Sequence, residues 1–316
     1  MLSASCERDE MDEISGTHYI RVYINENIKN VTEGIHYENI EVPELTLPKA
    51  LRVMLCDQIT GEIVSERYLQ DTGRDDKGYY FDGYVAADKG DYRLIVYNYG
   101  TETTQIRNAG NGLLAEAYTE PISAQYNTES LDFDARESMS LDNTNIIYNP
   151  DHLWTVSDPY VHIESNQDRD TIYAQNHEYY KANSIVNTYY YEVKVSGAQW
   201  IDSISSNITS IAGSKIIHDG EILTTSPSVQ YLNMKKNKVL PAQKDLQTTT
   251  YYATFNTFGK QPNSKSSIYI TLNFKMTDGS MQNKKIDITD LFYNEDAVQH
   301  NWLLDKDVIS LSAPSK

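Results

Sequence analysis

Cysteine, long apolar runs and positive charge are all scarce in this sequence of 316 residues. Cysteine occurs only at Cys6 and Cys56, so a disulfide framework is excluded as the stabilising device. No apolar run approaches the ~18–20 residues that a membrane-spanning helix needs. The 45 acidic residues outnumber the 27 lysines and arginines, which gives a net charge of −18. Because phosphates repel such a chain, we expect it to bind no nucleic acid.

The motifs of common enzyme classes are also missing. The sequence has no G-x-S-x-G elbow, no H-E-x-x-H helix, no glycine-rich phosphate loop and no C-x-x-C pair. We therefore nominate no catalytic residue and expect a protein that is not an enzyme and uses no cofactor.

Two groups of side chains could imitate a metal site. His152 and His162 have acidic neighbours, and Asp71, Asp75 and Asp76 form an acidic cluster. The histidine spacing is not diagnostic of a metal, and basic residues interrupt the acidic cluster, which lacks the ligand order of an EF-hand. We expect ordinary surface histidines, a solvated acidic turn and no bound metal.

The residues that are abundant favour β-structure. Tyrosine occurs 25 times, against 6 phenylalanines and 3 tryptophans, and it suits a half-exposed sheet better than a helix interior. Charge is unevenly distributed, because residues 1–150 carry 27 acidic and 12 basic side chains whereas residues 151–316 carry 18 and 15. This contrast predicts two domains. We expect a tether at 1–17, an N-terminal domain at 18–147 and a C-terminal domain at 148–316.

Alternation of apolar and polar residues predicts strands in both halves. In His18–Ile24, for example, every second residue is aliphatic. The other expected strands are Leu51–Leu55, Ile63–Leu69, Gly78–Val85, Asp91–Tyr97, Tyr126–Ser140, Thr188–Ser196, Thr249–Asn256, Ser267–Met276, Lys284–Ile288 and Asp307–Leu311. Short strands with turn residues between them predict antiparallel β-sandwiches rather than βαβ units.

One segment of the second half has a helical spacing instead. Ile201, Ile204, Ile208 and Ile211 recur at intervals of 3, 4 and 3, and Gly213 follows as a stop signal. Serines and β-branched residues weaken this helix, but the spacing predicts a short helix packed on the C-terminal sheet.

The tyrosine-rich strands admit two interpretations. Pairs such as Tyr79-Tyr80 and the run Tyr189–Tyr191 could stack against sugars on an exposed face. We favour the simpler role, in which the rings brace a sheet from both sides and leave their hydroxyls in water.

Cys6 follows Leu2, Ser3, Ala4 and Ser5, and the small residues directly before the cysteine resemble the end of a bacterial lipoprotein signal peptide. In that reading a peptidase cuts before Cys6 and its thiol carries lipid, and residues 1–5 are the remnant of a leader. Leucine usually stands three positions before the cysteine, where this chain has Ser3, and the apolar part of the leader is absent. The alternative is a plain buried or free cysteine. For Cys56, which lies in a strand pattern, we expect a packed and inert thiol.

Several motifs of the two halves, taken in order, resemble the fimbrillin-like lipoproteins of Bacteroidota. This family comprises type V pilus subunits and many uncharacterised relatives. The residues that carry the resemblance are Asp91–Asn98 in the first half, and Ile201–Gly213, His218–Gly220, Thr254–Gly259, Met276–Gly279 and Ile286–Asp290 in the second.

The resemblance implies two transthyretin-like β-sandwich domains on a lipoprotein of the outer membrane, anchored through acylated Cys6. Acidic residues after the cysteine, among them Glu7, Asp9 and Glu10, match in character the family's signal for export to the cell surface. The implied partners are pilins or other fimbrial subunits, which the family joins by strand donation. A host glycan or protein is a further partner that the family context allows.

Two features of family assembly remain open in this chain. Family pilins are opened by cleavage after an arginine, and Arg21, Arg52, Arg67 and Arg74 are all available. Only eight residues follow Val308, which is short for a donated strand unless the last strand itself is donated. This length favours an anchor or accessory subunit that accepts a strand. The alternative function is a sugar- or matrix-binding surface lipoprotein outside any pilus.

Overall fold

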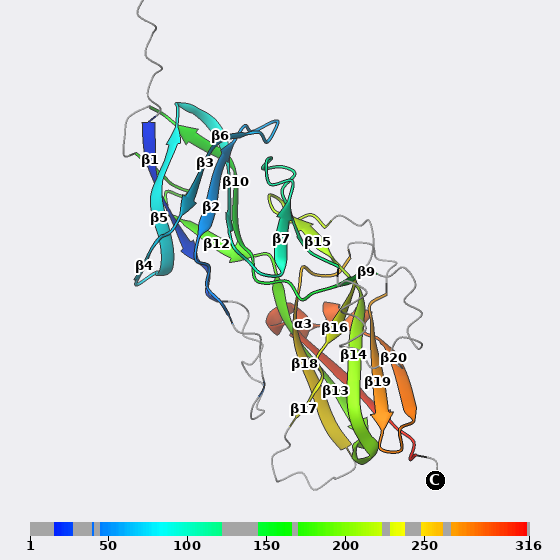
Figure 1. The fold of residues 1–316 in the computed structure, drawn as a ribbon. Helices are drawn as coiled ribbons and strands as arrows, with labels where there is room; N and C mark the ends of the chain where they lie inside the picture. The colour runs from blue at the N-terminus through cyan, green and yellow to red at the C-terminus, as the bar shows by residue number, and fades with distance from the viewer. Residues whose placement is uncertain are drawn as a thin grey trace, which may run out of the picture.

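The structure, a computed structural model, describes residues 16–27, 40, 45–121, 145–165, 170–222, 228–237, 248–261 and 267–314. These residues form two sandwich-like bodies of β-strands with a small sheet between them (Figure 1). The expected mainly β architecture is confirmed, whereas the transthyretin-like connectivity stays a prediction. The expected strand at 126–140 lies outside the described residues, as do Cys6, Glu7, Asp9 and Glu10.

The first sandwich is a sheet that folds over on itself, with the strand order β3-β2-β6-β10-β12-β1-β5-β4 and with β11 beside β1. Its strands are β1 (Gly16–Ile24), β2 (Leu51–Cys56), β3 (Ile63–Leu69), β4 (Asp71–Asp75), β5 (Gly78–Ala87), β6 (Gly90–Asn98), β10 (Trp154–Ile163), β11 (Thr171–Ile172) and β12 (Tyr180–Ser184). Alternate residues of these strands, such as Ile20, Val53, Phe81 and Leu94, meet in one buried core.

The second sandwich packs a sheet of order β17-β18-β13-β21 on a sheet of order β20-β19-β14-β16-β9. The strands are β9 (Asn145–Ile147), β13 (Asn187–Ser196), β14 (Ile201–Ile211), β16 (Ser228–Leu232), β17 (Lys235–Lys236), β18 (Thr248–Thr257), β19 (Tyr269–Met276), β20 (Met281–Asp287) and β21 (Trp302–Ser310). Tyr191, Phe255 and Phe274 lie in its core. The 3-10 turns are η1 (Ala198–Trp200) and η2 (Thr289–Tyr293), and the helix α3 (Glu295–His300) precedes β21.

A third sheet, of order β15-β8-β7, lies between the sandwiches. It consists of β7 (Thr104–Arg107), β8 (Glu116–Thr119) and β15 (Ser214–Ile216), and its pairing of β8 with β15 links the two halves of the chain. An apolar cluster crosses the same junction, because Met54 and Tyr97 of the first sandwich pack with Ala117, Ala212 and Phe258. The two sandwiches therefore share a buried interface.

The expected domain division after residue 147 stays a prediction, and strand pairing crosses that point of the sequence in both directions. β10 and β12 follow that residue in the sequence, yet they pair with β6 and β1 of the first sandwich. β9, which precedes it, pairs with β16 of the second sandwich.

The helix expected at Ile201–Gly213 is wrong, because Ile201–Ile211 forms strand β14. The pairing of β14 shifts register between Ile201 and Ser203 and again between Ile208 and Ile211. Each bulge adds a residue and turns the spacing of two isoleucines from two to three, which imitates a helical period. The β-branched side chains that weakened the helix prediction suit a strand.

Two further expectations are corrected. The acidic cluster is not simply a solvated turn: Asp71–Asp75 forms the edge strand β4, and only Asp76 and Lys77 lie in a turn. The sheets are also not purely antiparallel, since β1 pairs in parallel with β11 and β12, and β13 pairs in parallel with β21. Parallel pairing requires long connections, and these strands are far apart in sequence.

Candidate functional site

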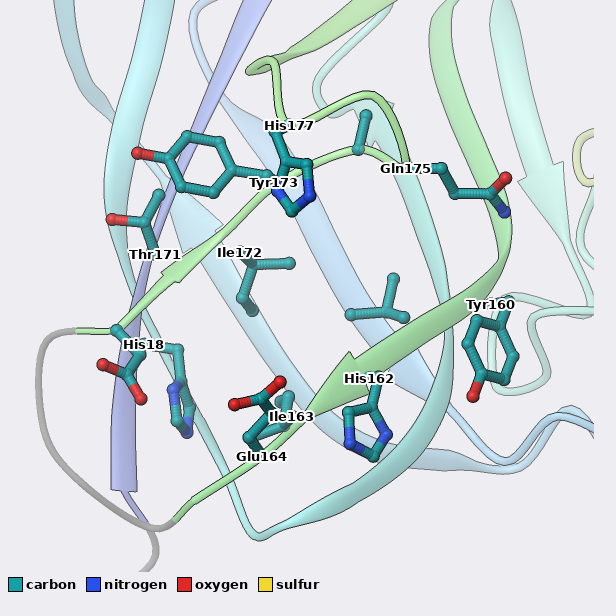
Figure 2. A pocket seen from close by; sticks show the side chains of 13 residues that line it. His18, Tyr160, His162, Ile163, Glu164, Thr171, Ile172, Tyr173, Gln175 and His177 are labelled. Atoms are coloured by element: carbon teal, nitrogen blue, oxygen red, sulfur yellow. The ribbon is translucent and has the colours of Figure 1, made fainter.

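The candidate site is a gap in the first sandwich between β10 and β11. β10 pairs with β6 from Thr155 to Ile163, but it pairs with β12 only at Trp154 and Thr155. Beyond this point β11 diverges from β10 and pairs with β1 instead. Among the described residues, no strand adjoins the remaining length of β10 on this side (Figure 2). An unpaired strand edge of this kind is a template for another strand.

The sequence around Pro159 explains why the sheet opens here. The register of β10 against β6 shifts between Asp158 and Val161. Proline has no backbone N–H to donate and is restricted to strand edges and bulges. The Tyr180 hydroxyl lies 3.0 Å from both Asp158 Oδ2 and Tyr173 O, so it braces the two sides of the gap. Burial, with the Asp158 carboxylate beside it, raises the pKa of Tyr180 and keeps it neutral.

The gap contains a cavity of about 540 Å³, which we call the β10–β11 cavity. Its floor is apolar, because Val161, Ile163 and Ile172 belong to the core of the sandwich. Polar and aromatic side chains surround it, as Figure 2 shows for Tyr160, His162, Glu164, Tyr173 and His177. An apolar floor with a polar rim and this volume is typical of a binding site.

Two histidines beside the cavity are held by hydrogen bonds. His18 is buried, with Nε2 3.1 Å from Ala87 O, and His162 is half exposed, with Nδ1 2.6 Å from Asp91 Oδ1. Over the described ranges, no group of three or more histidine, cysteine, aspartate or glutamate side chains is arranged to hold a metal ion. The arrangement is suited to binding an extended chain or a small molecule.

The structure separates the two histidines that the sequence placed together. His162 is a surface residue, as expected, but His152 is not, since its side chain is buried at the junction of the sandwiches. Its Nδ1 lies 3.0 Å from Ser184 Oγ and its Nε2 lies 3.1 Å from Thr188 Oγ1. Burial lowers the pKa of His152 to about 4. The surface interpretation failed because sequence does not show that β12 and β13 enclose this residue.

Cys56 is confirmed as a packed thiol. It lies in β2 as a free and buried cysteine, and burial raises its pKa to about 11. The thiolate is the reactive form of cysteine, so this thiol is inert at neutral pH.

The four arginines available for processing have different environments. Arg21 lies in the middle of β1, between β5 on one side and the β11–β12 segment on the other. Arg52 is buried in β2, where its guanidinium bonds Glu66 and the Tyr97 hydroxyl. Arg67 lies in β3 and Arg74 in β4, which are edge strands of the sheet, and Arg74 forms an ion pair with Glu26.

Sequence reasoning did not find the β10–β11 cavity. A signal was present, because Pro159 interrupts the alternating run Trp154–Ile163. A proline within a strand pattern indicates either an edge strand or a β-bulge.

The sequence is similar to a known family and to a curated protein. Residues 48–233 match the model of a family described as "Domain of unknown function (DUF5119)". The chain is 25% identical over 251 residues to the protein named "Putative fimbrium anchoring subunit Fim4B" of Bacteroides ovatus, which covers 78% of this chain and 67% of that protein.

Solved structures show the same likeness. A crystal structure of a "putative adhesin" from Bacteroides ovatus superposes with a TM-score of 0.62 and 20% identity, over 100% of this chain and 99% of that chain, and it supports the fold. The fimbrial anchor protein Mfa2 from Porphyromonas gingivalis has a TM-score of 0.49 and 14% identity, over 90% of this chain and 88% of that chain, so its similarity is weaker. Among the described residues, no helix is long and apolar enough to cross a membrane.

Proposed function

This chain belongs to the DUF5119 family of domains of unknown function, and on that premise we propose that it is a fimbrial subunit of the anchoring or accessory kind. The observation that carries the proposal is the similarity to a protein named as a fimbrium anchoring subunit, which extends over 78% of this chain. The role is structural rather than enzymatic.

The proposed mode of assembly is strand complementation at the β10–β11 cavity. A donated strand lying beside β10 would supply hydrogen bonds to its unpaired edge, and its alternate side chains would reach Val161 and Ile172 on the floor. The apolar floor of the cavity and the unpaired backbone of β10 lie side by side. One inserted strand would cover the floor with its side chains and hydrogen-bond the backbone of β10.

The proposed location is the cell surface, with the chain held in the outer membrane through lipid on Cys6. The acidic residues Glu7, Asp9 and Glu10 would act as the signal for surface export. A single acyl chain binds a membrane only marginally, so stable anchoring requires the multiple chains of a lipoprotein cysteine.

Filling the cavity tests the mode of assembly. Ala174 lines the cavity, so Ala174→Trp should block an incoming strand, whereas Ala86→Trp adds the same bulk to the exposed side of β5. Each purified variant is mixed with candidate pilins and examined for complexes that survive on denaturing gels. We expect complexes with the wild-type chain and Ala86→Trp but not with Ala174→Trp. Equal complex formation by both variants would exclude this cavity as the acceptor, and no complex with any pilin would count against the function itself.

A further inference from the structure

The outer face of the sheet formed by β1, β5 and the segment after β11 gathers an unusual number of tyrosines. Strand alternation and register explain the gathering, since Tyr19 pairs with Tyr84, Arg21 with Asp82, and Tyr23 with Tyr80. We call this surface the tyrosine face; its aromatic members are Tyr19, Tyr23, Tyr80, Tyr84, Tyr173 and Tyr179.

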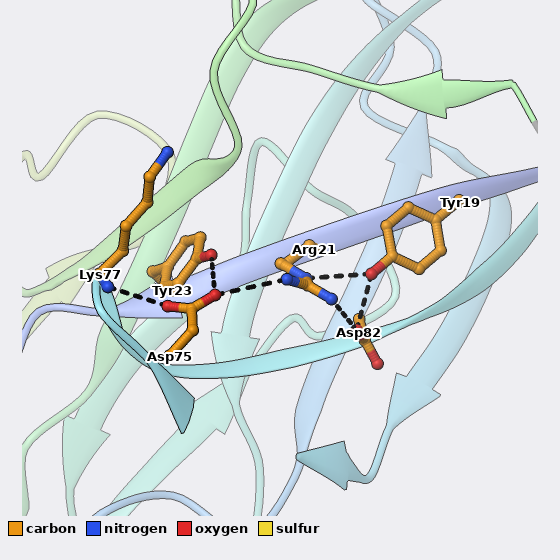
Figure 3. A network of polar contacts seen from close by, with 6 residues as sticks. All are labelled: Tyr19, Arg21, Tyr23, Asp75, Lys77 and Asp82. Carbon is orange, nitrogen blue, oxygen red and sulfur yellow. Dashed lines mark hydrogen bonds and ion pairs between the residues drawn. The ribbon is translucent and has the colours of Figure 1, made fainter. Parts of the chain in front are cut away.

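Arg21 fixes the centre of the tyrosine face (Figure 3). Its Nη2 donates to Asp82 Oδ2 at 2.8 Å and its Nη1 lies 3.5 Å from Asp75 Oδ2. The Tyr19 hydroxyl donates to the same Asp82 oxygen at 2.6 Å, and the Tyr23 hydroxyl donates to Asp75 Oδ2 at 2.7 Å. Two carboxylates and two hydroxyls are therefore held in place by one guanidinium.

The aromatic rings are held as firmly as the polar groups. The Arg21 guanidinium carbon lies 3.9 Å from the centre of the Tyr80 ring. The ring of Tyr80 fits across β4 only because residue 73 is glycine, where a Cβ atom would come within 2.4 Å of it. Tyr84 contacts Tyr19 edge to face at 5.6 Å between centroids. Such a surface loses little conformational entropy when a ligand binds.

Groups remain available for a ligand on this ordered surface. Tyr84 and Tyr173, at the margins, are 51% and 40% exposed. The second carboxylate oxygen of Asp82, Oδ1, accepts no hydrogen bond from the described residues, while Oδ2 accepts two. Tyr173 also lines the β10–β11 cavity, so the tyrosine face is continuous with its rim.

We propose that the tyrosine face binds a neutral saccharide. A sugar ring presents C–H groups, which are attracted to the negative faces of aromatic rings, and hydroxyls, which donate to carboxylates. The charge of the surface selects against anionic sugars, because Arg21 is already shared by two carboxylates within a chain of net charge −18. The tyrosine face is the outer face of the sheet and leaves the edge of β10 free, and of its six tyrosines only Tyr173 also lines the β10–β11 cavity.

The other tyrosine run of the sequence does not share this property. Tyr190 and Tyr191 are fully buried in the second sandwich, and Tyr189 packs against its core. There the rings brace the sheet as the simpler interpretation expects, but the hydroxyls are not left in water, since the Tyr190 hydroxyl donates to Glu192 Oε2 at 2.7 Å in the interior.

A glycan array probed with the full chain tests the proposal. We expect saturable binding to neutral oligosaccharides and little binding to sialylated or sulfated ones. In titrations with the best neutral glycan, the double variant Tyr84→Ala/Tyr173→Ala should bind at least about tenfold more weakly, since tyrosine is enriched among the residues that contribute most to binding. Tyr293→Ala is the matched control, because Tyr293 is 60% exposed and lies outside the face.

Three outcomes would overturn the proposal: no saturable binding to any neutral glycan, undiminished binding by the double variant, or a preference for anionic glycans, which would point to Lys181 beside Tyr23. Pilin complexes and sugar binding measured on the single variant Tyr84→Ala, which keeps Tyr173 on the rim of the cavity, separate this result from the proposed assembly role. Loss of sugar binding with intact complexes would confirm that the two activities are distinct.

Discussion

The ring of His152 joins the two sandwiches, because its Nε2 lies 3.1 Å from Thr188 Oγ1 at the start of β13. Thr188 Oγ1 in turn donates to Asn256 Oδ1 at 2.7 Å, and Asn256 Nδ2 donates to Pro150 O at 3.1 Å. This buried chain of hydrogen bonds crosses the junction beside the apolar cluster. A fully satisfied polar network of this kind favours one relative placement of the two bodies.

The His152 contact predicts a loss of stability in mild acid. Burial lowers the pKa of His152 to about 4, whereas in the unfolded chain it is near 6.5. Between pH 4 and 6.5 the unfolded state therefore binds more protons than the folded state. The stability that neutral His152 contributes is complete above pH ~6.5, falls as the pH decreases and is lost near pH 4. From pH 7.5 to 5 the free energy of unfolding should fall by about 2 kcal/mol from this residue.

Urea denaturation of the wild type, His152→Gln and His162→Gln at both pH values measures this effect. His162→Gln is the control for removing an exposed histidine, and His152→Gln should lose about 2 kcal/mol of the wild-type pH dependence. Identical pH dependence in all three proteins would contradict the assignment.

Cleavage after Arg21 should be slow in the native protein. The residue lies within β1, hydrogen-bonded to strands on both sides, and its side chain bonds Asp82, so a protease must wait for β1 to detach. Arg52 is protected by burial, while Arg67 and Arg74 lie in edge strands. Digestion with an arginine-specific protease, followed by mass spectrometry, should detect cuts after Arg67 or Arg74 before any fragment that begins at Val22.

The same digestion in urea provides the reference, since all four bonds are then accessible. Early release of a fragment beginning at Val22 from the folded chain would show that β1 is a removable strand.

Lipid attachment at Cys6 predicts a specific labelling pattern. Cells that lipidate exported proteins, fed an alkyne fatty acid, should label the wild-type protein and Cys56→Ala, because the Cys56 thiol is buried and inert. Cys6→Ala should abolish the label and release the protein from the membrane fraction. A labelled Cys6→Ala protein would remove the basis for the lipid anchor.

Sequence patterns predicted most individual strands but not their partners. Ile20, Val22 and Ile24 alternate within β1, and this local property survives folding. The parallel pairing of Val22 with Tyr180 is not local, because it depends on which distant strand completes the sheet. The opening beside β10 could not be predicted from the sequence for the same reason, although Pro159 indicated a strand edge.

Helix α3 shows the opposite case, in which a local signal was present and overlooked. Asn294 caps the helix by accepting a hydrogen bond from Ala297 N at 2.7 Å, and acidic residues occupy its first turn. His300 lies in its last turn, and Asn301 ends it with a φ of 59°. These are standard start and stop signals for a helix of two turns or fewer, too short to show an apolar period.

A close contact between Cys56 and Gly112 predicts a coupled pair of substitutions. A Cβ atom on residue 112 would lie 2.6 Å from Cys56 Sγ and 3.3 Å from Ile95 Cγ1. Gly112→Ala should therefore destabilise the first sandwich by about 1–3 kcal/mol through overpacking. Cys56→Ala alone should also destabilise it, because the lost sulfur leaves a void in the junction cluster.

The double variant Cys56→Ala/Gly112→Ala should be more stable than the sum of the two single effects predicts, since the added methyl group occupies the space that the sulfur vacates. Denaturation of the four proteins gives the coupling free energy, which we expect to favour the double variant by about 1 kcal/mol or more. Ala86→Gly, at an exposed position on β5, provides an uncoupled partner for Gly112→Ala in a control cycle. Strict additivity in the Cys56 cycle would show that residue 112 relaxes away from the sulfur and that the contact does not limit packing at the junction.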